Sequence, residues 1–222
     1  MKNLLEKDFI NYYNRHPESP VSKSEINVIL CSTEDREFEL KDTKGEGCAK
    51  YVNPNKLRIN IINYEEFIKP LPPRIKNTND IGKDICDFIV YSENSQFFLL
   101  NELTNTAPEF IYEYQNLKGK QEGKLAKAQR QLKHSLESII KVPKIYDYIR
   151  QFTTKQCCFF NSYSFVLLDI NAEQAFNQLD EIDSSKPSKL PNPEIEAFGF
   201  DFLIYSASQT YLLSSSVKTI AE

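Results

Sequence analysis

Apolar side chains repeat at helical spacing in two segments of this chain. In residues 4–15, Leu5, Phe9, Tyr12 and Tyr13 fall on one side of a helix, which predicts an amphipathic helix ending before Pro17. A longer helix is predicted over about 120–141, limited by Pro143. Its apolar stripe consists of Leu125, Ala128, Leu132, Leu136 and Ile139.

Strands are predicted where short apolar or alternating runs are bounded by turn residues. These runs are 27–31, 37–40, 57–61, 85–91, 96–103, 156–160, 163–170, 197–206 and 210–213. The two clearest pairs, 85–103 and 197–213, read as β-hairpins. Together with the two helices they predict an α/β (α+β) fold, in which helices flank a mixed central β-sheet. We expect residues 1–222 to form a single domain.

Composition narrows the class of protein. Of the 222 residues, 41% are hydrophobic and 26% are charged, which is ordinary for a folded domain. The net charge of −4 disfavours binding to nucleic acid through a global basic field. The five cysteines are odd in number and form no CxxC pair, so we expect reduced thiols in a cytoplasmic protein. Neither a signal peptide nor a membrane span is apparent in the sequence.

The hairpin at 85–103 carries two carboxylates. If its turn at 92–95 is symmetric, Asp87 lies opposite Leu100 and shares a face with Glu102. The two acids then form a diagonal pair, with backbones about 7–8 Å apart, and can reach one divalent cation. Both strands are otherwise strongly apolar, and unpaired carboxylates are costly to bury there. A metal site is one explanation of the pair, and a salt-bridged or solvated pair is the other.

A second hairpin limits what Asp87 alone can indicate. Asp201 begins the same Asp-Phe-aliphatic-aliphatic-Tyr-Ser run at 201–206, but Ser216 stands where Glu102 would align. The metal-site hypothesis therefore depends more on Glu102 than on Asp87.

The run Asp87-Phe88-Ile89-Val90, followed by a turn and by Phe98 to Thr104, resembles the PD-(D/E)xK nuclease superfamily. The resemblance implies a restriction-endonuclease-like core over about 80–170, with Mg²⁺ or Mn²⁺ held by Asp87 and Glu102. It also implies a catalytic Lys two residues after the second acid, where this chain has Thr104. Lys124 or Lys127, on the following helix, are the candidates to replace that amine.

A basic cluster follows the hairpin. Its members are Lys118, Lys120, Lys124, Lys127, Arg130 and Lys133. Lys120, Lys124 and Lys127 have the spacing of one helix face, which suits contacts with nucleic-acid phosphates. The alternative is the solvated face of an amphipathic helix.

These features predict a metal-dependent nuclease that hydrolyses nucleic-acid phosphodiester bonds, with DNA preferred over RNA. The alternative is a catalytically inactive binding or interaction module of the same fold, favoured by Thr104 and the negative charge. Such a module could pair with an effector in a bacterial defence or toxin system. A homodimer and a separate protein partner are both compatible with the sequence.

Overall fold

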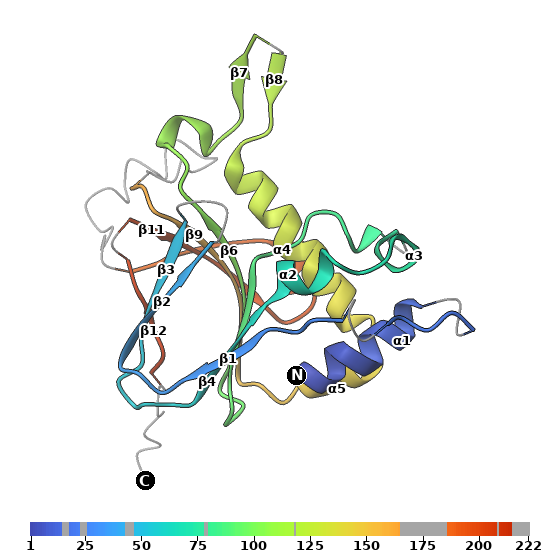
Figure 1. Cartoon of the computed structure of the whole chain (residues 1–222). Helices are drawn as coiled ribbons and strands as arrows, with labels where there is room; N and C mark the ends of the chain where they lie inside the picture. The colour runs from blue at the N-terminus through green and yellow to red at the C-terminus, as the bar shows by residue number, and fades with distance from the viewer. Residues whose placement is uncertain are drawn as a thin grey trace.

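The computed structural model describes residues 1–14, 18–22, 26–42, 47–77, 80–117, 119–164, 186–207 and 209–214 (Figure 1). Its centre is a seven-stranded sheet in the order β1-β4-β5-β6-β9-β11-β10. Neighbouring strands in the run β1-β4-β5-β6 are antiparallel, whereas β6, β9 and β11 are parallel to one another. The predicted mixed sheet and α/β class are therefore confirmed. The strands are β1 Leu30–Thr33, β4 Ile59–Asn63, β5 Phe88–Ser92, β6 Phe97–Thr104, β9 Thr154–Asn161, β11 Asp201–Ser206 and β10 Ser188–Leu190.

Helices cover one face of this sheet. The longest, α4 (Lys124–Ile140), connects β6 to β9, because parallel neighbours need a crossover connection. Its buried Leu132 and Leu136 share a core cluster with Ile89 and Leu100 of the sheet. The other helices of this layer are η1 Leu4–Phe9, α1 Ile10–Tyr13, α2 Tyr64–Ile68, α3 Pro73–Lys76, α5 Pro143–Ile149 and α7 Pro193–Glu196.

A small sheet covers the opposite face. It contains β2 (Glu37–Lys41), β3 (Cys48–Val52) and β12 (Tyr211–Leu212) in the order β12-β3-β2. A cluster rich in tyrosine fills the space between the sheets, where Tyr51 of β3 lies near Phe160 and Tyr211. The molecule therefore has a helical layer, a central sheet and a small second sheet (Figure 1).

A two-stranded ribbon projects beyond the N-terminus of α4 (Figure 1). It consists of β7 (Tyr114–Asn116) and β8 (Gly119–Gln121), and a short 3₁₀ helix at Pro108–Phe110 precedes it. Among the described residues, no helix is long and apolar enough to cross a membrane.

One predicted element is wrong, and the start of another is shifted. The predicted long helix is α4, which begins at Lys124 rather than at residue 120 and directly follows Gly123, whose backbone lies so close to Tyr112 that a Cβ would meet its carbonyl carbon at 2.2 Å. The predicted hairpin at 197–213 does not form, because β11 pairs with β9 in the large sheet and β12 pairs with β3 in the small one.

Other predictions are confirmed or shifted. Leu5, Phe9 and Tyr13 of the first helix are buried, whereas Tyr12 is exposed. The strand expected at 27–31 is β1, three residues later, and β3 was not predicted. Of the strand expected at 163–170, residues 165–170 lie outside the described residues.

Candidate metal centre

The β5–β6 hairpin brings Asp87 and Glu102 together. Its observed register pairs Ile89 with Leu100, and the Asp87 N–H donates to the Asn101 carbonyl at 3.0 Å. The predicted pairing of Asp87 with Leu100 is therefore wrong, although both acids line the same hollow. The register differs because the Ser92 hydroxyl accepts hydrogen bonds from the backbone N–H groups of Gln96 and Phe97, both at 2.9 Å, and so lengthens the turn.

Two further acids join the pair, and sequence reasoning missed both. Ligand oxygens of Asp42, Glu65 and Asp87 all lie within 4.8 Å of one another. Asp42 directly follows β2, where its N–H donates to the Gly47 carbonyl at 3.0 Å. Glu65 lies in the first turn of α2, and its own N–H donates to the Asp87 carbonyl at 3.3 Å.

A hollow of about 470 Å³ opens over these carboxylates. Two predicted basic residues of α4, Lys124 and Lys127, lie in its wall. The structure thus brings together the predicted acids and the two predicted lysines. The lining residues are Asp42, Gly47, Glu65, Asp87, Glu102, Leu103, Thr104, Asn105, Thr106, Lys124, Lys127 and Gln131.

Burial and crowding of like charges disfavour the ionised carboxylates. Burial is the main cause that raises the pKa of Asp87, and the negative charges of Asp42 and Glu65 raise it further. The Leu103 N–H, 2.8 Å from Asp87 Oδ2, acts in the opposite direction. Burial also raises the pKa of Glu102, with the Asp87 charge as the next cause. In the described part of the chain, Glu102 Oε2 is buried without a hydrogen-bond partner.

Cations partly offset this negative charge. Lys69, at the C-terminal end of α2, forms ion pairs with Glu65 and, at 3.6 Å, with Glu66. Its charge lowers the pKa of Asp87, and the charge of Lys127 lowers that of Glu102. Lys69 was not predicted, because its position one helical turn after Glu65 is common on solvated helix surfaces.

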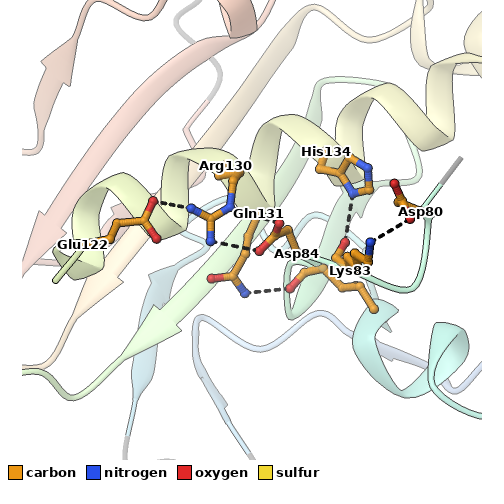
Figure 2. A network of polar contacts seen from close by, with 8 residues as sticks. Asp80, Lys83, Asp84, Glu122, Arg130, Gln131 and His134 are labelled. Carbon is orange, nitrogen blue, oxygen red and sulfur yellow. Dashed lines mark hydrogen bonds and ion pairs between the residues drawn. The ribbon is translucent and has the colours of Figure 1, made fainter. Parts of the chain in front are cut away.

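The segment before Asp87 is tied to α4 by successive hydrogen bonds (Figure 2). These contacts join His134 Nδ1 to the Lys83 carbonyl (2.8 Å), Arg130 to Asp84 (3.1 Å), Gln131 to the Ile85 carbonyl (2.9 Å) and the Cys86 N–H to the Ser135 hydroxyl (2.8 Å). The next backbone N–H, that of Asp87, donates to Asn101 of β6 at 3.0 Å. Asp87 is therefore positioned from both the helix and the neighbouring strand.

The predicted basic helix face is only partly formed. Lys120 lies in β8 and pairs with Glu113 at 2.6 Å. Arg130 pairs with Asp84 and Glu122, and Lys133 pairs with Glu194 and Glu137. Lys118 lies outside the described residues. Lys124 and Lys127 have no ion pair within the described chain and line the hollow instead.

The look-alike acid at Asp201 behaves differently from Asp87. It is partly exposed at the start of β11 and pairs with Lys189 of β10 at 2.6 Å. The same local sequence therefore gives an ordinary ion pair at Asp201 and a buried carboxylate cluster at Asp87.

Comparisons with known proteins add no relative to this picture. No protein-family model matches the chain. Neither the curated proteins nor the solved structures contain a match. The chemistry of the site therefore rests on the residues described above.

Proposed function

We propose that this protein is a metal-dependent phosphodiesterase that cleaves nucleic acid, with DNA preferred over RNA. The observation that carries the proposal is the convergence of four acids and two lysines on one open hollow. The acids are Asp42, Glu65, Asp87 and Glu102, and the lysines are Lys124 and Lys127.

The donor set fits a divalent cation. Carboxylate oxygens are the ligands that Mg²⁺ and Mn²⁺ prefer. Asp42, Glu65 and Asp87 would hold the ion, with Glu102 and its unpartnered oxygen beside them. Burial and then like-charge repulsion raise the pKa of Asp87 and of Glu102, and a cation there would stabilise their ionised forms against both. When bound, such an ion lowers the pKa of a coordinated water and stabilises charge developing on a phosphate.

The lysines supply what the carboxylates lack. Lys124 and Lys127 face the hollow from α4 and are placed to bind non-bridging oxygens of a phosphodiester. Either amine could replace the lysine that the PD-(D/E)xK pattern has at the position of Thr104. Lys69 would orient Glu65 through their ion pair.

The order of elements also supports this resemblance. An antiparallel hairpin carries the acid pair, and a helix then crosses over to a parallel strand. The resemblance implies this order of elements around the two acids.

Plasmid nicking with Mg²⁺ or Mn²⁺ tests the proposal. The wild-type protein should convert supercoiled DNA to open circles, and Glu102→Gln or Asp42→Asn should reduce the rate by about 100-fold or more. Asp147→Asn, a change at an exposed acid on α5, is the matched control and should leave the rate unchanged. Equal activity of the wild type and both site variants would sink the proposal.

A non-catalytic binding module is the second candidate. It is favoured by Thr104, whose hydroxyl hydrogen-bonds to that of Thr106 at 2.7 Å and offers no amine. This reading expects Mn²⁺ and nucleic acid to bind without cleavage. It also expects Thr104→Lys to gain nicking activity, because the acids needed for the metal are already in place.

A further inference from the structure

The segment that carries the β7–β8 ribbon begins and ends at the wall of the hollow. The chain leaves the wall at Thr106 and returns to it at Lys124. Between these residues it forms the ribbon, which stands out from the body beside the N-terminus of α4 (Figure 1). A polymer with one phosphodiester in the hollow can extend from it toward the ribbon.

The chemistry of the ribbon differs from that of the whole chain. Residues 114–121 read Tyr-Gln-Asn-Leu-Lys-Gly-Lys-Gln, with two lysines, three carboxamides and no acid, although the chain has a net charge of −4. Gln115 and Asn116 are exposed, and Leu117 at the tip is fully exposed. An apolar tip between amides and amines is suited to contacts with bases and phosphates.

The base of the ribbon is held firmly to α4. The Leu125 N–H donates to the Ile111 carbonyl at 3.0 Å, and Gly123 packs directly on the backbone of Tyr112. The rings of Phe110 and Tyr114 lie edge to face with centroids 4.9 Å apart. The ribbon is therefore fixed relative to Lys124 and Lys127 in the hollow.

We propose that the β7–β8 ribbon enters the major groove of duplex DNA and fixes which phosphodiester reaches the acids. This inference rests on the proposed function and specifies its substrate as a duplex. Strands of three residues extend about 10 Å, which is comparable to the depth of about 8.5 Å of the major groove. That groove is about 12 Å wide and admits a two-stranded ribbon.

The side chains of the ribbon match chemical groups of duplex DNA. Carboxamides such as those of Gln115 and Asn116 can bond both major-groove positions of adenine, and Leu117 can contact a thymine methyl group. Lys120 would exchange its partner Glu113 for a backbone phosphate. The major groove of duplex RNA is too deep and narrow for such readout, so DNA is favoured.

Fluorescence anisotropy with a labelled DNA duplex tests the inference, with every protein in a Glu102→Gln background so that the DNA stays intact. The variant Gln115→Ala/Asn116→Ala/Lys120→Ala should weaken duplex binding by about tenfold or more. The control Lys141→Ala/Gln151→Ala, at exposed positions beyond the opposite end of α4, should bind as tightly as the background protein.

Hydrolysis of the small diester bis(p-nitrophenyl) phosphate, measured without the Glu102 change, separates the two proposals. The ribbon variant should keep the wild-type rate, because this substrate does not reach the ribbon. Unchanged duplex binding by the ribbon variant, or equal affinity of the background protein for duplex RNA, would overturn the groove inference. Ribbon-dependent DNA binding with no diester hydrolysis by wild type would support the inference and overturn the hydrolytic proposal. If the ribbon instead bound a protein and not DNA, the groove inference would be overturned.

Discussion

At the scale of single residues, the folded structure disfavours the ionised form of Asp87. Its carboxyl is buried beside other carboxyls, so its pKa in the folded state lies above the value of about 3.9 in an unfolded chain. At any pH between these two pKa values, the folded protein therefore binds more protons than the unfolded one. The contribution of Asp87 to stability is full below the unfolded pKa and is lost as pH rises through the folded pKa.

Asp87→Asn should therefore stabilise the metal-free protein at about pH 8, by roughly 1–3 kcal/mol, and much less at about pH 4. Urea unfolding in EDTA at the two pH values measures the difference. The matched control is Asp147→Asn, at an exposed position, which should change stability little at either pH. A loss of stability in Asp87→Asn at pH 8 would contradict burial as the dominant cause.

Metal affinity should depend on pH in the opposite sense. Because the pKa of Asp87 and that of Glu102 are raised, a cation must displace protons that these carboxyls hold around neutral pH. The Mn²⁺ dissociation constant should rise by about tenfold per pH unit for each displaced proton as pH falls. Calorimetric titration in two buffers with different ionisation enthalpies counts the protons released. Constant affinity across the neutral range would contradict this picture.

Only part of the acid cluster was predictable from sequence. Asp87 and Glu102 were found because alternation along strands places residues on faces, and that rule survives a register change of two residues. Asp42 and Glu65 were not found, because their proximity to Asp87 depends on how β2 and α2 pack rather than on any local pattern. Lys124 and Lys127 were predicted near the acids because their helix follows the hairpin, and the structure places both in the wall of the hollow.

At the scale of elements, α4 acts as a splint for the segment that leads into β5. Successive contacts from Lys83 to Ile85, drawn in Figure 2, and the contact of the Cys86 N–H with Ser135 fix the backbone just before Asp87. Ser135 is the most buried of the α4 residues that make these contacts, and it is only 2% exposed. It also accepts the N–H of the residue adjacent to Asp87.

Ser135→Ala should lower the free energy of unfolding by about 1–3 kcal/mol, because the buried Cys86 N–H loses its acceptor. It should also weaken Mn²⁺ binding, since the backbone that carries Asp87 loses a restraint. Ser32→Ala removes an exposed hydroxyl that bonds Asn60 at 2.7 Å, and serves as the control with a cost of less than about 0.5 kcal/mol. Denaturant melts and calorimetry measure the two effects separately. Full Mn²⁺ affinity in folded Ser135→Ala would show that this contact does not position the site.

The sequence predicted the existence of α4 and of the β5–β6 hairpin better than their ends. Helical periodicity identified the stripe from Leu125 to Ile139, which the structure buries. It could not detect the ribbon before Lys124, because the lysine spacing continues through residues that are extended. The pairing of β12 with β3 could not be predicted either, because the pattern of apolar residues in a strand does not indicate which strand it pairs with.

At the scale of the whole molecule, the site lies where the two sheets meet. Gly47, near the start of β3, approaches the end of β6 so closely that a Cβ would lie 2.7 Å from the Thr104 nitrogen. The neighbouring Asp42 reaches the cluster from the same side of the molecule. Close contact between the sheets is thus a condition for bringing Asp42 to Asp87.

Gly47→Ala should force the sheets apart at this point and weaken Mn²⁺ binding by about tenfold or more, with a stability loss of about 1–3 kcal/mol. Gly199→Ala is the matched control, because Gly199 has φ +76° and its added Cβ meets only Lys155, at 3.8 Å. That variant should lose about 1 kcal/mol through backbone strain and keep its Mn²⁺ affinity. Metal titration of both variants below their melting temperatures compares them. An equal Mn²⁺ affinity in the two variants would mean that the Gly47 contact does not control the site.

The pairing of β12 with β3 also affects the order in which the small sheet is assembled during translation. A ribosome releases the N-terminal part of a chain first, so Asp42, Glu65, Asp87 and Glu102 all emerge well before Tyr211. Until β12 arrives, β3 has β2 on one edge and none of the described strands on the other. The third strand of the small sheet is therefore added to β3 only after all four acids have emerged from the ribosome.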